Sequence, residues 1–393
     1  MTNMTLKIPF HKPYITEDEI NAVADSMRQG WLTMGPKTVE FEKQFARAVG
    51  APHAVAVNSC TAALHLALKC IDLKPGDEVI IPAMTFVATA EVVRYFDAVP
   101  VLVDIEGDTH NMDVSTIERK ISGRTRAIIP VHFAGQPADM DEIMDLAGKH
   151  NLTVIEDAAH SFPALYKDRR VGSIGHITCY SFYATKTITT GEGGMAVTAN
   201  EEWAERMRVL RLHGISRDAW KRYTDEGTWR YDVIETGYKY NMTDPAAAMG
   251  LEQLKKAEMM KEGRSRIAEL YTTAFSEKKG LIPYTVKNDR DCAWHLYPLK
   301  LDIDVLSISR DRVIEELKER GIGTSMHFIP LPVFSHYGDL GYRIEDFPGS
   351  RYVFERTVSL PIYYGMSDDE VGYVIESVLD VVGEYATEGR IER

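Results

Sequence analysis

The fold is decided by the stretch CYSFYATKT, residues 179–187, and by the TTGEGG that follows it at residues 189–194. Lys186 in this stretch lies on a short polar turn between an apolar strand and a cluster of glycines. A lysine in such a turn can point its amine into a pocket, where it is a candidate for Schiff-base chemistry. Most lysines are solvated surface charges, so Lys186 alone favours that simpler interpretation. Two other segments of the sequence favour the Schiff-base interpretation of Lys186 instead.

The first of these segments is VIEDAAH, residues 154–160, an apolar strand that ends in the carboxylate of Asp157. If the two strands are parallel neighbours, Asp157 and Lys186 meet at the carboxyl edge of one sheet, where open α/β sheets bind ligands. Pyridoxal phosphate needs this pair, because an amine holds its aldehyde and an anion keeps its pyridine nitrogen protonated. The alternative for Asp157 is a helix cap, a common role for aspartate at a strand end.

The second segment is VAVNSCTAALHLAL, residues 55–68, which is typical of a strand, a polar turn and a helix rich in alanine and leucine. Free backbone N–H groups at the start of that helix suit a phosphate monoester, and the helix dipole adds to the attraction. Every strand-to-helix turn has some of this character. The three segments together supply a phosphate cup, a pyridinium partner and a lysine amine in a consistent order.

An ordered set of motifs resembles the DegT/DnrJ/EryC1/StrS family of pyridoxal-phosphate-dependent sugar aminotransferases. The resemblance runs from Gly30 to about Pro361. The matching stretches are GWLTMGP (30–36), SCTAAL (59–64), PAMTF (82–86), EDAAH (156–160), SFYATK (181–186) and GYKYNMTD (237–244). The resemblance implies the α/β architecture of fold-type I aminotransferases.

Seven short apolar runs alternate with helical patterns, which predicts a mostly parallel seven-stranded sheet between helices. The runs are His53–Val57, Glu78–Pro82, Val99–Val103, Arg126–Val131, Thr153–Glu156, Ile177–Phe182 and Met195–Thr198. The last run follows a short glycine-rich link, so it can enter antiparallel, as the family fold implies. We expect a large cofactor-binding domain over residues 1–254 and a small C-terminal α+β domain over residues 255–393. The second is expected to hold a strand near His295–Leu301 and helices near Ser309–Arg320 and Asp368–Val381.

Composition narrows the class of protein. The 393 residues, 45% of them hydrophobic, can bury a large core. A formal net charge of −13 argues against broad nucleic-acid binding. No stretch is long enough to span a membrane, and the first residues lack the apolar centre of a signal peptide. The four cysteines have no metal-binding spacing, which favours reduced thiols in a cytoplasm.

The resemblance assigns cofactor roles residue by residue. Lys186 would form the internal aldimine and then move a proton between the substrate carbon and the cofactor, while Asp157 would pair with the pyridinium. Phe86 would stack on the ring, with ordinary core packing as its alternative. The backbone amides of Cys60 and Thr61 would hold the phosphate, and Ser181 would supply a hydroxyl. Glycine is frequent at the position of Cys60, but a small residue there still permits a close approach.

The resemblance also implies roles for two further residues, His160 and Asn241. His160 falls where many members carry glutamine, beside the phenolic oxygen of the cofactor, and either side chain can donate a hydrogen bond to that oxygen. Metal binding is not expected, because no HExxH or comparable cluster surrounds His160 or the other histidines. Asn241 resembles the residue that reaches the cofactor phosphate of the neighbouring subunit. The active sites would therefore be shared in a homodimer.

The substrate is implied by the same resemblance. Trp31 and Thr33, with His327 and Phe328, match regions that face the nucleotide-sugar in relatives; their alternative is turn and interdomain packing. The string GYKYNMTD, with His160, most resembles enzymes that aminate C4 of UDP-linked keto sugars with glutamate as the donor and 2-oxoglutarate as the product. The alternative is a C3 aminotransferase that acts on a dTDP-linked keto sugar.

Other classes of protein are disfavoured by particular residues. Dehydratase relatives carry histidine where this chain has Lys186. A nonenzymatic regulator or sensor would not need the complete set of cofactor residues. A nicotinamide-binding enzyme would need GxGxxG after its first strand, whereas GEGG at residues 191–194 leads into another strand.

Overall fold

The computed structural model describes residues 6–216 and 231–386. A seven-stranded sheet forms its centre, in the order β1-β9-β8-β5-β4-β2-β3. The strands are β1 (His53–Val57), β2 (Glu78–Pro82), β3 (Val99–Val103), β4 (Thr125–Ile128), β5 (Thr153–Asp157), β8 (Ile177–Ser181) and β9 (Gly194–Thr198). Only β9 runs antiparallel to its two neighbours. The predicted mostly parallel α/β sheet, with a reversed last strand, is confirmed.

Helices cover both faces of this sheet because successive strand residues point to opposite sides. Val55 and Val57 of β1 pack with helices α3, α4 and α6, whereas Ala54 and Ala56 pack towards α2. Helix α5 covers the second face further along. The helices of this part of the chain are α1 (Glu17–Arg28), α2 (Pro36–Val49), α3 (Cys60–Cys70), α4 (Ala88–Arg94), α5 (Met140–His150), α6 (Glu201–Leu210) and α7 (Asp244–Lys255).

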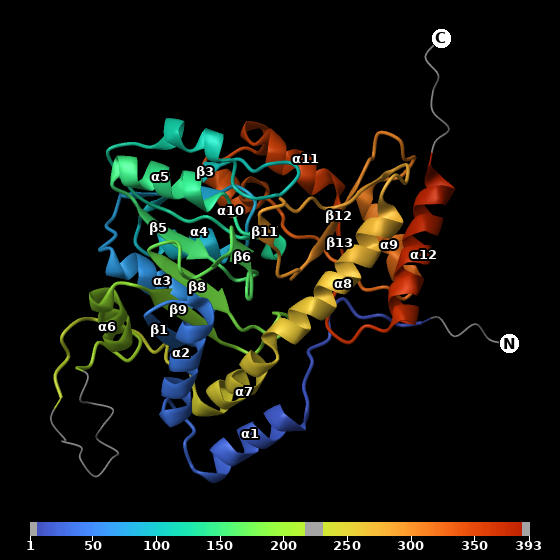
Figure 1. Ribbon diagram of the computed structural model, residues 1–393. Helices are drawn as coiled ribbons and strands as arrows, with labels where there is room; N and C mark the ends of the chain where they lie inside the picture. Colours follow the sequence, from blue (N-terminus) through green and yellow to red (C-terminus); the bar gives the residue numbers. More distant parts are fainter. Residues whose placement is uncertain (1–5, 217–230, 387–393) are drawn as a thin grey trace.

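A second core lies at the far end of helix α8, which runs from the large sheet towards the C-terminal part of the chain (Figure 1). It is built on a three-stranded sheet and on helices that follow α7. The strands are β10 (Leu281–Ile282), β12 (Tyr297–Leu301) and β13 (Thr357–Leu360). The helices of this core are α8 (Ala257–Phe275), α9 (Arg310–Glu319) and α12 (Asp368–Tyr385). Two other helices, α10 (Ser335–Asp339) and α11 (Pro348–Arg356), follow α9 in the chain but pack outside this core.

The predicted division at residues 254 and 255 falls where α7 gives way to α8. Segments of each part also pack in the other part. Tyr337 of α10 and Phe347 pack in the core of the large sheet. Ile8 packs in the second core. A third small sheet joins β11 (Arg290–Asp291) to β6 (Leu165–Tyr166) and β7 (Arg169–Arg170), which ties the segment before β12 back to the large domain. The division into two domains at residues 254 and 255 therefore remains a proposal, because each part of the chain contributes segments to the other part.

The fourth run has the largest error in a predicted strand end, since the other ends agree to within one residue. The fourth run was expected to continue to Val131, but β4 ends at Ile128. Pro130 cannot donate a hydrogen bond to a neighbouring strand, so the regular ladder stops before it. Beyond the proline, Val131 forms a single parallel bridge with Asp157. This loop brings Val131 to the edge of the cavity described next.

Candidate active site

A cavity of about 320 Å³ opens at the carboxyl ends of β5 and β8. It collects most of the side chains that the sequence singles out. The predicted site residues that line it are Cys60, Thr61, Phe86, Asp157, His160, Ser181, Lys186, His327 and Phe328. These residues come from segments as far apart as the start of α3 and the loop before α10. The fold therefore brings these predicted polar and aromatic side chains together around the same cavity.

Lys186 and Asp157 reach this cavity from neighbouring strands. Strands β5 and β8 are parallel, and Asp157 lies opposite Cys179 in their register. The chain turns after β8, with the amide of Lys186 donating to the carbonyl of Tyr183 at 2.9 Å. Surrounding protein disfavours the charged amine and lowers the pKa of Lys186 to about 8. A lysine with this pKa has a usable fraction of neutral, nucleophilic amine near neutral pH.

Asp157 is buried on the face of the sheet that α4 covers. Thr89 Oγ1 of α4 donates to Asp157 Oδ2 at 2.9 Å, and the Ala159 amide donates to Oδ1 at 3.2 Å. Burial raises the pKa of the Asp157 carboxyl, although these two hydrogen bonds act in the opposite direction. A buried carboxylate with spare acceptor capacity is suited to receive a cationic N–H group.

Helix α3 begins at the floor of the cavity. Ser59 caps it, and its side-chain oxygen accepts from the Ala62 amide at 3.1 Å. Among the described residues, the amides of Cys60 and Thr61 have no such partner, so their N–H groups are free to bind an anion. Gly194 of β9 packs directly against this turn, because a Cβ at this position would lie 2.4 Å from the Ser59 carbonyl. Only glycine permits this approach of β9 to the helix start.

Aromatic rings form one wall of the cavity. The His160 ring stacks on Phe328 at 5.7 Å and lies 4.4 Å from the ring of His295. Burial, followed by the charge of Lys186, holds the pKa of His160 well below its ordinary value. Phe86 is 57% exposed beside Phe328. Ordinary core packing, the alternative for Phe86, does not describe a ring this open to the cavity.

Three predicted site residues do not line the cavity of their own chain: Trp31, Thr33 and Asn241. Asp244 ties their two loops together. Its carboxylate accepts from the amides of Gly35 and Thr38 at the start of α2, and its own amide donates to the Thr33 carbonyl at 3.0 Å. The loops that hold Trp31 and Asn241 therefore form one anchored unit.

Sequence reasoning did not single out two residues that touch the central groups. Thr89 donates to Asp157, and His295 Nε2 lies 3.3 Å from Lys186 Nζ. A hydroxyl on an apolar helix and a histidine far along the chain carry no local motif, so only the tertiary fold assigns them. Within the part of the chain that the structure describes, no cluster of His, Cys, Asp and Glu could hold a metal ion. None of the helices described there is long and apolar enough to cross a membrane.

Comparison with known proteins identifies the family. Residues 13–379 match the model of the DegT/DnrJ/EryC1/StrS aminotransferase family. The spore coat polysaccharide biosynthesis protein SpsC of Bacillus subtilis is 49% identical, covering 95% of this chain and 97% of SpsC. The chain therefore belongs to this family of pyridoxal-phosphate-dependent sugar aminotransferases.

Solved structures agree with this assignment and with the expected fold-type I architecture. The pyridoxal-phosphate form of the sugar aminotransferase Spr1654 from Streptococcus pneumoniae superposes with a TM-score of 0.91 and 35% identity, over 97% of this chain and 100% of that one. PseC of Helicobacter pylori, an aminotransferase in the biosynthesis of pseudoaminic acid, gives a TM-score of 0.90 at 26% identity, over 97% and 100% of the two chains.

The residues around the cavity fit pyridoxal phosphate. Lys186 offers an amine of lowered pKa for the aldehyde, and Asp157 offers a buried carboxylate for the pyridine nitrogen. The free amides at the start of α3 offer donors for the phosphate. His160 Nδ1 is buried and has no hydrogen-bond partner among the described residues, so it is available to a polar ligand. The donor set thus matches each functional group of the cofactor.

Proposed function

We propose that this enzyme transfers an amino group from glutamate to the C4 keto carbon of a nucleotide-linked sugar. The observation that carries the proposal is the meeting of Lys186 and Asp157 at the ends of two parallel strands, in one cavity. The family membership supports the reaction class, and the GYKYNMTD string at residues 237–244 supports the C4 position. Amination at C3 of a dTDP-linked sugar is the alternative.

Lys186 is the proposed catalytic base and acid. Bound pyridoxal phosphate supplies an aldehyde that condenses with amines and a ring that draws electrons from the bonds of the attached carbon. Lys186 Nζ removes the proton from the carbon that carries the amino group and returns it on the way to product. A pKa of about 8 suits both directions, because the amine can accept and release a proton near neutral pH.

The other residues would bind and orient. Asp157 would hold the pyridine nitrogen in its protonated form, which increases the electron demand of the ring. The amides of Cys60 and Thr61 would hold the phosphate with the hydroxyl of Ser181, and Phe86 would stack on the ring. His160 would donate to the phenolic oxygen, because burial keeps its ring neutral with one N–H to give.

The sugar side of the site is proposed to include His327 and Phe328. Both line the cavity at its wall, and His327 Nδ1 hydrogen-bonds to Ser359 Oγ at 2.9 Å, which fixes the ring. SpsC is named for polysaccharide biosynthesis and PseC for pseudoaminic acid biosynthesis. These names support an amino sugar destined for a surface or coat polysaccharide as the product.

The direct test is a substrate panel. Purified enzyme with pyridoxal phosphate and glutamate is offered UDP-, dTDP- and GDP-linked sugars with the keto group at C4 or C3. We expect 2-oxoglutarate and an amino sugar to form with a 4-keto sugar, identified by mass spectrometry and NMR. Efficient turnover of a 3-keto sugar alone would replace the C4 assignment with the alternative. Glutamate conversion without any sugar product would separate a wrong acceptor from an inactive preparation.

A shared active site in a homodimer is part of the proposal. Asn241 does not line its own chain's cavity. Its Nδ2 donates one N–H to the Met242 carbonyl at 3.3 Å and carries a second N–H that can bind another acceptor. We propose that Asn241 donates to the cofactor phosphate of the partner subunit, while Lys186 and Asp157 serve their own subunit. Trp31 and Thr33 would reach the sugar nucleotide from the same anchored unit.

Subunit mixing tests the shared site. Lys186→Ala and Asn241→Asp subunits should each be inactive, the second because a carboxylate repels the phosphate. In a mixed dimer one site combines a native Lys186 with the partner's native Asn241, and the other carries both defects. Activity should return to about half the wild-type value for each mixed dimer, since one of its two sites is intact. Verified exchange with no returning activity, or a fully active monomer, would contradict the shared site.

A further inference from the structure

The segment from Tyr284 to His295 crosses from the second core to the large domain and ends beside the active-site lysine. We call residues 284–295 the strap. It leaves the small sheet after β10, pairs with β6 through β11, and returns to the small sheet at β12. His295, its last residue, places Nε2 at 3.3 Å from Lys186 Nζ. The strap thus joins both domains to the reacting amine.

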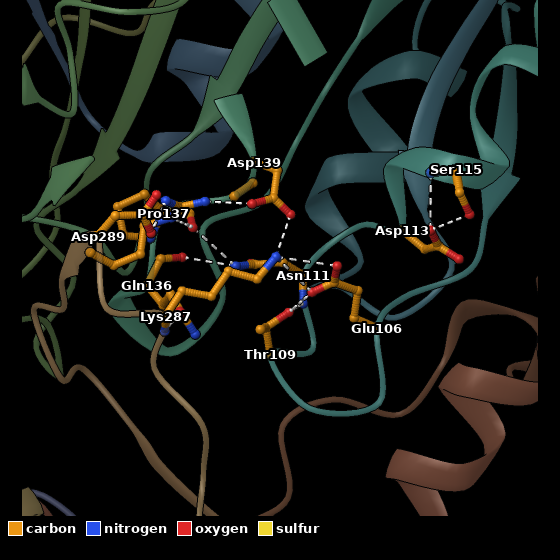
Figure 2. Close-up of polar contacts among 12 residues, drawn as sticks. Glu106, Thr109, Asn111, Asp113, Ser115, Gln136, Pro137, Asp139, Lys287 and Asp289 are labelled. Carbon is orange, nitrogen blue, oxygen red and sulfur yellow. Dashed lines mark hydrogen bonds and ion pairs between the residues drawn. The ribbon is translucent and has the colours of Figure 1, made fainter. Parts of the chain in front are cut away.

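Gln136 fixes the first part of the strap to the large domain (Figure 2). Its side chain is fully buried and uses both ends of its amide. Nε2 donates to the Tyr284 hydroxyl at 2.9 Å and to the Thr285 carbonyl at 3.0 Å, and Oε1 accepts from the Lys287 amide at 2.8 Å. Lys287 also pairs with Asp139 at 2.6 Å. These contacts leave the start of the strap little freedom to move.

Gly135 and Arg264 fix the last part. The Ala293 amide donates to the Gly135 carbonyl at 3.0 Å, and a Cβ on Gly135 would lie 2.8 Å from the Trp294 amide nitrogen. Gly135 has φ of 104°, which favours glycine as well. Arg264 Nη1 donates to the carbonyls of His295 at 3.3 Å and Ile362 at 2.8 Å. The last residues of the strap are therefore held by Gly135 at Ala293 and by Arg264 at His295.

We propose that His295 is a catalytic residue that positions the Lys186 amine by accepting a hydrogen bond from it at Nε2. In this role His295 holds Nζ inside the cavity whenever the amine is free, so that the amine stays in place to receive and return the substrate proton. The strap is the device that positions His295. This inference rests on the proposed role of Lys186 and adds a partner to it.

The surroundings keep His295 an acceptor rather than a competing base. Burial, followed by the charge of Lys186 and then by His160, Arg264 and His327, holds the pKa of His295 well below its ordinary value. On the amine, burial acts with Arg264 to favour the neutral form, against Cys60 and Asp157. A neutral imidazole facing a lysine of higher pKa leaves the proton on Nζ and accepts a hydrogen bond from it.

The first test measures the amine directly, with no substrate. Cofactor is removed from wild type, His295→Gln, His295→Leu and the control His336→Gln, whose histidine is exposed on α10. Acetylation of Lys186 is followed against pH by peptide mass spectrometry. The wild-type midpoint is expected near the pKa of about 8. Leucine removes the acceptor that stabilises the protonated amine, so its midpoint should fall by about one pH unit, a tenfold change. Glutamine, which keeps an acceptor, should stay near wild type.

The second test follows proton transfer. The reloaded enzymes are mixed with glutamate carrying hydrogen or deuterium at its α carbon, and the loss of the bound-cofactor absorption band is timed. We expect His295→Leu to slow this half-reaction by about ten- to a hundredfold with a larger isotope effect, while the KM for glutamate stays within about threefold. His295→Gln should recover most of the rate. Equal midpoints and equal rates in the glutamine and leucine variants would overturn the proposal and reduce His295 to a packing residue.

A third measurement does not depend on the folding of a His295 variant. In cofactor-free protein labelled with ¹⁵N-histidine, the Nε2 resonance of His295 should show a hydrogen-bonded lone pair in wild type and lose that shift in Lys186→Ala. An unchanged resonance would refute the contact. Because neither this measurement nor the acetylation needs a sugar or glutamate, a wrong acceptor in the proposed reaction leaves both outcomes intact.

Discussion

Glu156 and Asp157 are consecutive residues of β5, both buried, and they face opposite sides of the sheet. Glu156 accepts from His132 Nε2 at 2.8 Å, Thr178 Oγ1 at 2.6 Å and the Gly175 amide at 2.8 Å. The Ala138 amide donates to His132 Nδ1, so Nε2 is the protonated nitrogen of that ring. Burial alone would raise the pKa of Glu156, but these hydrogen bonds hold it below its ordinary value.

Asp157 accepts from two such donors within the described part of the chain, and its pKa is raised. We propose that β5 carries a structural carboxylate, Glu156, on one face and a functional one, Asp157, on the other. A satisfied buried carboxylate stabilises the fold, whereas an incompletely satisfied one is costly until a ligand arrives. Both carboxylates are buried, so the unmet acceptor capacity of Asp157 is the property that makes it the candidate for binding a ligand.

The largest expected effect is on the reacting amine. Lys186→Ala should lower transamination by at least about 10⁴-fold, because no other group supplies the amine and the proton transfer. Single-turnover conversion with glutamate measures it. Lys149→Ala, which removes an exposed lysine paired with Glu118, serves as the control and should keep full activity. Turnover by Lys186→Ala within tenfold of wild type would remove Lys186 from its proposed role.

Asp157→Asn should cost the next largest factor. A neutral amide cannot stabilise the pyridinium charge, so the half-reaction with glutamate should slow by about 10²- to 10³-fold while cofactor still binds. Glu156→Gln, the same change one residue away on the other face, should alter the rate of folded, cofactor-loaded enzyme by less than about threefold. Similar losses in both variants would mean that the two carboxylates do not differ in function.

Glu156→Gln is expected to have the small effect on the rate but the large effect on stability. In Glu156→Gln, one carboxylate oxygen becomes an NH₂ group that would face another N–H or O–H donor. We expect the free energy of unfolding to fall by about 2 kcal/mol, the cost of leaving buried donors unpaired. Urea unfolding of the cofactor-free protein, with the slope compared between variants, provides the measurement. A loss below about 0.5 kcal/mol would show that His132 and Thr178 find other partners.

The sequence predicted the parts of this comparison that local patterns encode. The seven strands appear as apolar runs; Asp157 stands at the end of one of them, and Lys186 lies on the turn that follows another. The order of strands in the sheet depends on long-range pairing and was not predicted. The partners that separate Glu156 from Asp157 were also missed, because Thr178 and Thr89 lie on different elements and resemble ordinary strand and helix residues. His295 reaches Lys186 only through the strap, whose anchors are set by the tertiary fold.

The smallest expected effect is a gain in stability with a distinct pH dependence. The folded pKa of Asp157 lies above its ordinary value of 3.8, so the folded protein binds this proton more tightly than the unfolded chain. The stability that this proton contributes is complete below pH 3.8 and is lost as pH rises through the folded pKa. Cofactor-free Asp157→Asn lacks this loss and should be about 1 kcal/mol more stable than wild type at neutral pH. Glu156 has the opposite sign, since its lowered folded pKa gives stability that is lost as pH falls below 4.5. Urea midpoints of wild type and both variants, measured between pH 3 and 8, would test these two opposite pH dependences. If both variants were more stable than wild type at neutral pH, or both less stable, the contrast between the two faces of β5 would be wrong.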